Sequence, residues 1–176
     1  MAVPGSPNYR VGLIIARAQP FHNGLVKIIG DAMMTCDDLI ISFVNYDTGF
    51  FDYNHNQKMG RLMYGTEING ASYISYFGTK ANPLVVTPKQ ILEETLLQLE
   101  EANWNKPTHF FTHLEEWVTP AMELQLETQH ISSLVNNDSN EILNSFENGT
   151  DLWESKVPFR LLEEIKTYIA TKNRTF

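Results

Sequence analysis

Short apolar runs alternate with amphipathic stretches along most of this chain. Residues 11–15 and 38–44 are almost continuously apolar and rich in branched side chains, which is typical of strands buried in a parallel sheet. Residues 24–36 and 88–102 repeat apolar side chains at helical spacing, and Pro88 stands where helices often begin. The pattern therefore predicts strands followed by helices.

The rest of the chain continues this alternation. The other predicted elements are a helix over 56–67, a third strand at either 73–77 or 84–86, strands over 108–112 and 129–135, a helix from Asp138 to Asn148-Gly149, and a last helix from Pro158. Asp138 with Glu141 has the spacing of a capping box, and glycine is favoured just after a helix end. Both signals bracket the helix that precedes the last one.

Alternating strands and helices predict an α/β fold: a Rossmann-like, doubly wound parallel sheet with helices on both faces. The 176 residues suit a single domain over 10–176, after a flexible N-terminal lead-in over 1–9. Such sheets bind ligands at the carboxyl ends of their strands, where the strand order reverses. The loops over 16–24 and 45–55 are therefore expected to border one crevice.

Composition narrows the function classes. The formal net charge of −8 argues against a general nucleic-acid-binding protein, which would present a basic face. Cys36 is the single cysteine, which excludes an intrachain disulfide and a cysteine-rich zinc site. No apolar run approaches the roughly 20 residues of a membrane span, and no signal peptide is evident, so we expect a cytoplasmic protein without membrane contact.

The turn after the first strand carries the candidate chemistry. An apolar strand ends in a small polar turn that leads directly into a helix, and unpaired N–H groups at a helix start attract phosphate. Arg17 and His22 flank this turn, and Gly24 permits close approach of a ligand to the backbone. The sequence therefore predicts a phosphate cradle without a Walker lysine motif.

Residues 16–25, Ala-Arg-Ala-Gln-Pro-Phe-His-Asn-Gly-Leu, resemble the opening of nucleotidyltransferases with the His-x-Gly-His signature. They are most similar to the archaeal-type nicotinamide mononucleotide (NMN) adenylyltransferases, which read Gly-Arg-(Phe/Met)-Gln-Pro-Phe-His-x-Gly-His. Arg61 follows Asn54 by seven residues, as in that family's Asn-Pro-Phe-…-Glu-Arg stretch, although the intervening Pro-Phe and Glu are not matched. Residues 139–158 resemble its Ser-x-Thr-x-Ile-Arg segment together with the helix end, Trp and Val-Pro that come after that segment. The resemblance covers 10–68 and 138–170.

The resemblance implies transfer of AMP from ATP to NMN, giving NAD and pyrophosphate, with Mg²⁺ accompanying ATP. His22 and Arg17 are the implied catalytic residues that hold the phosphates. The candidate nucleotide contacts are Ala16, Ala18, Gln19, Phe21, Gly24, Asn45, Asn54, Arg61 and Asn140. Asn54 is also interpreted as a helix cap, and Arg61 as a surface ion-pair residue. Members of this group often self-associate, so a homo-oligomer is expected, and sister groups use other phosphorylated acceptors such as pantetheine phosphate.

Two departures from the family pattern bear on activity. The second His of the signature is Leu25, and the Arg of the later segment is Leu143, so neither can donate to phosphate. By analogy with the removal of an oxyanion donor, each loss lowers the rate by roughly 10²–10³. The alternative hypothesis is therefore a catalytically degenerate protein that keeps the fold and binds a nucleotide or serves a structural, assembly function.

Overall fold

A parallel sheet organises the part of the chain that the structure describes. The structure, a computed structural model, describes residues 6–16, 18, 21–44, 51–65, 73–80, 87–131, 142, 144–145 and 148–173. The strands of its five-stranded sheet are β1 (Val11–Ala16), β2 (Asp38–Val44), β3 (Tyr73–Thr79), β4 (His109–Thr112) and β5 (Glu127–His130). They lie in the order β3-β2-β1-β4-β5, and every neighbouring pair is parallel. The predicted α/β class is confirmed.

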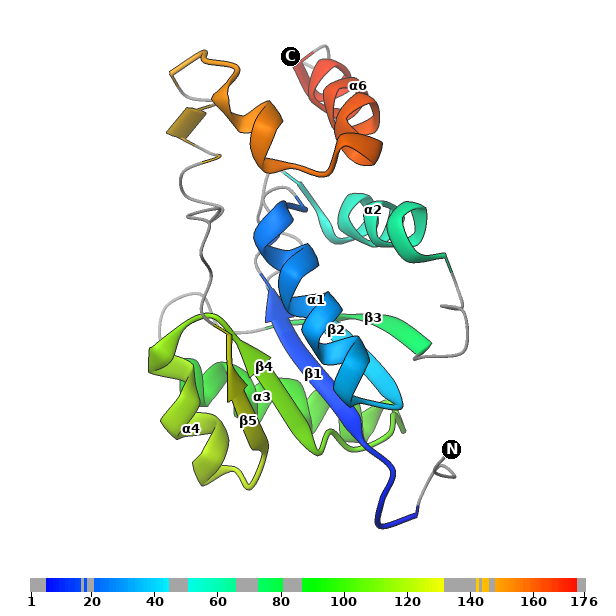
Figure 1. Cartoon of the computed structure of the whole chain (residues 1–176), viewed down its shortest axis with the longest axis vertical. Helices are drawn as coiled ribbons and strands as arrows, with labels where there is room; N and C mark the ends of the chain where they lie inside the picture. The colour runs from blue at the N-terminus through cyan, green and yellow to red at the C-terminus, as the bar shows by residue number, and fades with distance from the viewer. Residues whose placement is uncertain are drawn as a thin grey trace.

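Helices cover both faces of this sheet, as Figure 1 shows. They are α1 (Asn23–Thr35), α2 (Tyr53–Tyr64), α3 (Pro88–Glu101), α4 (Val118–Glu123) and α6 (Leu162–Asn173). Helix α1 crosses one face, α3 lies behind the other, and α2 and α6 lie together beyond the carboxyl end of β1. Short 3-10 turns over Glu115–Trp117, Leu152–Lys156 and Phe159–Leu161 connect these elements.

The core has one half on each side of the sheet because side chains of a strand alternate between its faces. In β1, Leu13 belongs to the half that packs against α3 and α4, whereas Ile14 belongs to the half that packs against α1, α2 and α6. The predicted helix stripes are buried in these halves, including Ile29 and Ala32 in α1. Cys36 is a small buried residue of this core.

The strand order reverses next to β1. From β1 the chain proceeds outward through β2 and β3, and then crosses back to place β4 on the other side of β1. The side chain of Thr108, directly before β4, connects this segment with β1. The backbone N–H of Val11 donates to its Oγ1 at 2.9 Å across 97 residues of sequence. The loops after β1 and β4 therefore diverge from one point at the carboxyl edge, where doubly wound sheets bind ligands.

Some element boundaries differ from the prediction. Helix α2 begins at Tyr53 rather than at residue 56, because the carboxylate of Asp52 accepts from the N–H of His55 at 2.9 Å and caps the helix there. Asn54 is therefore not the cap. The third strand is the earlier of the two candidates and extends to Thr79, whereas 84–86 lie outside the described residues. Strand β5 starts at Glu127, two residues before its predicted start at Gln129.

The last helix begins later than predicted, but its apolar side chains are buried at helical spacing. A 3-10 turn over Phe159–Leu161 precedes α6, so the regular helix begins at Leu162 rather than directly at Pro158. Leu161 and Ile165 are fully buried, as their spacing predicts. Upstream, Gly149 has φ of 66°, the left-handed conformation of a residue that follows a helix end. Among the described residues, no helix has the length and apolar character needed to cross a bilayer.

Candidate functional site

His22 caps the helix that follows the first strand. Its backbone is extended, with φ of −136° and ψ of 168°, and its Nδ1 accepts from the N–H of Leu25 at 3.2 Å. Its carbonyl accepts the first regular helix bond, from Val26 at 3.2 Å. Histidine is not among the residues favoured at this position, so the capping function was not predicted from the sequence. The cap fixes the imidazole at the positive end of α1.

This hydrogen bond also determines which ring nitrogen of His22 carries the proton. Because Nδ1 accepts from a backbone N–H, the neutral imidazole of His22 carries its proton on Nε2. The N–H groups of Asn23 and Gly24 precede the first intrahelical hydrogen bond, so they are of the kind that binds anions at helix starts. An imidazole N–H donor and a helix start therefore occupy the same turn, next to the reversal of strand order.

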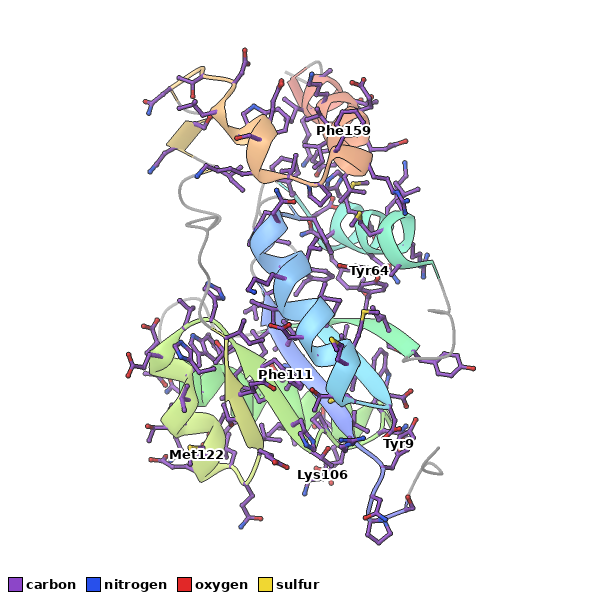
Figure 2. All side chains as sticks on the ribbon, in the orientation of Figure 1. Tyr9, Tyr64, Lys106, Phe111, Met122 and Phe159 are labelled. Atoms are coloured by element: carbon purple, nitrogen blue, oxygen red, sulfur yellow. The ribbon has the colours of Figure 1, made fainter. Side chains whose placement is uncertain are left out.

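The side chains around this turn are buried. Ala18 is 1% exposed, Phe21 is 0% exposed and His22 is 7% exposed. The ring of Phe21 packs in the core with its centroid 6.5 Å from that of Tyr64, which Figure 2 shows reaching from α2 toward α1. Ala16, at the end of β1, is 9% exposed. The side chains of Ala18 and Phe21 thus hold the turn in the core.

Leu25 is turned into the core as well. It is 2% exposed and belongs to the same apolar cluster as Ile28 and Ile29 of α1. The position that carries the second signature histidine in the resembling family is here an apolar anchor for the first turn of α1. Phe21 and Leu25, on either side of His22, thus both pack in the core.

Some of the other predicted nucleotide-contact residues lie in the described part of the chain, and the rest lie outside it. Asn54 and Arg61 both lie on α2 and are exposed, and Gly24 is half-buried in the first turn of α1. Other predicted contacts lie outside the described residues: Arg17, Gln19, Asn45 and Asn140, together with the position of Leu143. The structure thus places His22 and Gly24 together, and the contacts of these other residues stay predictions.

Sequence reasoning missed the buried polar side chains in the first turn of α2. Asn56 is 2% exposed, and its Nδ2 donates to the carbonyl of Ala18 at 2.8 Å and to that of Phe51 at 3.3 Å. His55 is 6% exposed, and its ring centroid lies 4.1 Å from that of Tyr168 in α6. These two residues occupy the unmatched Pro-Phe positions of the resembling motif, and that mismatch is the sequence signal that could have found them.

Burial changes the pKa values of several side chains in this region. Loss of solvation lowers the pKa of His55 to about 4, which keeps its imidazole neutral. Burial likewise raises the pKa of Tyr64 and of Tyr76. In the described part of the chain, His55 Nε2, Asn56 Oδ1 and both tyrosine hydroxyls are buried without a hydrogen-bond partner. Helix α2 therefore has an unusually polar buried face.

A separate groove of about 690 Å³ lies at the opposite edge of the sheet. Arg10 precedes β1, His109 begins β4 and Glu127 begins β5, so the groove they line is at the amino ends of the strands. His109 Nε2 and Glu127 Oε2 lie 3.1 Å apart across it. Within the described ranges, no group of three His, Cys, Asp or Glu side chains is placed to hold a metal ion.

The sequence matches no protein-family model and no curated protein. Solved structures share the fold. A bifunctional NMN adenylyltransferase/ADP-ribose pyrophosphatase from Francisella tularensis, complexed with AMP and a manganese ion, has a TM-score of 0.63 at 17% identity over 94% of this chain. A NadR protein in complex with NAD and AMP-PNP has a TM-score of 0.59 at 15% identity over 87% of it.

The match covers 53% of the Francisella tularensis chain and 46% of the NadR chain, so the alignment spans about half the length of these solved proteins. At this level of identity the similarity shows the fold, which is the nucleotidyltransferase-type Rossmann-like fold.

Proposed function

We propose that this chain binds an adenine nucleotide at the start of α1 and transfers AMP from ATP to NMN, giving NAD and pyrophosphate. The observation that carries the proposal is the geometry of His22, which caps α1 through Nδ1 and so presents Nε2–H as the donor nitrogen. The fold shared with an NMN adenylyltransferase and with a NadR protein bound to NAD supports it.

The proposed reaction needs no protein nucleophile. The phosphate of NMN attacks the α-phosphorus of ATP, and the bond from that phosphorus to the bridging oxygen of the β-phosphate breaks. His22 donates from Nε2 to the phosphate oxygens on which charge develops, and the N–H groups of Asn23 and Gly24 add the positive field of the helix start. Arg17 is proposed as the planar guanidinium partner of the triphosphate. Mg²⁺ arrives with ATP and screens its charge.

A second function is favoured by one observation, the burial of Leu25. Because this side chain is 2% exposed in the core, the first turn of α1 offers an imidazole donor at His22 but none at 25. A nucleotide site with fewer donors binds phosphate while stabilising the transition state less. The second candidate is therefore a protein that binds NAD or ATP with little or no turnover.

The test uses His22→Asn, because asparagine is a good helix cap that accepts from the same N–H but has no imidazole donor. Purified protein is incubated with ATP, Mg²⁺ and NMN, and NAD is quantified. We expect NAD formation by the wild-type chain, a drop of roughly 10²–10³ in rate for His22→Asn, and little change in its unfolding temperature.

Each outcome distinguishes the candidates. Absence of NAD at high enzyme concentration rejects adenylyl transfer, and calorimetric binding of NAD or ATP in that case supports the second candidate. If the wild-type chain binds neither ATP, NMN nor NAD, both candidates are rejected.

A further inference from the structure

The side chain of Asn56 joins two loops that the fold brings to the same edge of the sheet. One amide nitrogen, Nδ2, donates to the carbonyl of Ala18 in the loop after β1 and to the carbonyl of Phe51 in the loop after β2. The donor comes from α2, 38 residues after Ala18 in the sequence. Asn56 is therefore a three-way connection between α2 and both loops.

The two residues whose carbonyls accept from Asn56 are both buried. Ala18 lies four positions before His22 in the sequence and is 1% exposed. Phe51 is 1% exposed and stacks on Tyr168 of α6, with ring centroids 5.3 Å apart. Asn56 thus links the carbonyl of Phe51 directly with that of Ala18.

Burial of the Asn56 side chain is energetically unfavourable, which argues for a function besides packing. Asn56 is 2% exposed, and its Oδ1 has no hydrogen-bond partner within the part of the chain described here. Burying an unpartnered carbonyl oxygen is unfavourable, and an apolar residue at this position avoids that cost. The resembling motif has phenylalanine at this place, so the buried amide is a feature of this chain.

We propose that Asn56 is a positioning residue: its amide holds the backbone at Ala18 and at Phe51 in the arrangement that a bound nucleotide requires. This inference rests on the proposed function, since the nucleotide is the one assigned to the turn around His22. Asn56 acts through the carbonyls of Ala18 and Phe51.

The test compares Asn56→Leu, which has similar size and no amide, with a matched control on the other face of the sheet. Thr95 is also fully buried in α3, where its Oγ1 donates to the carbonyl of Ile91 at 2.8 Å and hydrogen-bonds Thr79. Thr95→Val removes a buried polar group of α3, in the half of the core on the other face of the sheet from Asn56. Dissociation constants for NAD are measured by calorimetry well below the unfolding temperature of every variant.

We expect Asn56→Leu to weaken NAD binding by about tenfold, and Thr95→Val to leave the dissociation constant within about twofold even where it lowers the unfolding temperature as much. Amide hydrogen exchange, recorded without ligand, should be faster at residues 21–25 and at 51–53 together in Asn56→Leu, and unchanged there in Thr95→Val.

The exchange experiment separates this inference from the proposed function. If the wild-type chain binds no nucleotide, the proposed function fails, and the positioning assignment for nucleotide binding falls with it even where both loops loosen together. If NAD binds and Asn56→Leu retains wild-type affinity, or if only one of the loops exchanges faster, the positioning assignment is wrong while the proposed function stands.

Discussion

Leu25 determines what a single substitution can do to the turn at the start of α1. Replacing it with histidine restores the signature of the resembling family in the sequence, but the imidazole would enter the apolar cluster around Ile28 and Ile29. An imidazole without a partner in such surroundings destabilises the fold. We therefore expect Leu25→His to lower the free energy of unfolding by about 1–3 kcal/mol in urea denaturation.

The matched control for this prediction is Leu25→Met, which conserves volume and apolar character and should cost less than about 1.5 kcal/mol. A Leu25→His variant with wild-type stability and faster NAD formation would show that the side chain at 25 reaches the phosphates. In that case the core packing of this residue would not limit the chemistry.

At this scale, the sequence predicted the helix start after His22 but not how the imidazole is held there. The spacing of His22 and Gly24 indicates a helix start, and the structure has one there. That the imidazole itself caps the helix was not predictable, because capping statistics favour Asp, Asn, Ser and Thr. Asn56 was missed since its partners are backbone carbonyls, which leave no trace in a side-chain motif.

Helix α2 lies so close to the sheet that only glycine fits at one position. A Cβ built on Gly60 would come within 2.5 Å of ring atoms of Tyr76 in β3, whereas a Cβ on Gly30 in α1 meets nothing within 4 Å. Alanine is the better helix former at both positions. The two glycines therefore provide a matched pair in which intrinsic helix preference is equal and only packing differs.

We expect Gly60→Ala to lower the free energy of unfolding by about 1–3 kcal/mol, because the tyrosine ring must move in a filled core. Gly30→Ala is expected to raise it by about 0.5–1 kcal/mol, since alanine restricts the unfolded chain without a clash. Chemical denaturation of both variants measures this difference. Equal effects of the two substitutions would contradict the close approach of α2 to β3.

The elements themselves were well predicted where the hydrophobic pattern is long and regular. The strand over 38–44 has the predicted bounds, and α3 ends one residue before its predicted end, at Glu101. The start of α2 was misplaced because the pattern does not reveal which polar residue caps it, and Asp52 does. Helix α4 was not predicted because it is short, spanning Val118–Glu123.

The stability of the whole molecule should depend on pH through His55, which connects α2 with α6. Its ring makes a tilted contact with that of Tyr168 and lies near the charges of Asp52, Lys58 and Glu164, while burial lowers its pKa to about 4. The unfolded chain binds a proton near pH 6.5, and the folded chain does so only near pH 4. Stability is therefore complete above about pH 6.5 and falls as the pH is lowered toward 4.

Between pH 7 and pH 4.5 this linkage amounts to about 2 kcal/mol of unfolding free energy. Urea denaturation at both pH values measures it, and His55→Phe, which keeps an aromatic ring next to Phe51 and Tyr168, serves as the control. The variant should show a correspondingly smaller loss of stability in acid. An identical acid loss in both proteins would assign the effect to other groups.

At the scale of the molecule, the order of assembly is set by the position of β1. This strand pairs with β2 soon after it in the chain, but its other partner, β4, ends at Thr112. A growing chain leaving the ribosome therefore holds β1 with one side unpaired until more than half of its residues have been synthesised. β1 is paired on both of its edges only after that moment, so the helix start at His22 acquires its final neighbours late in synthesis.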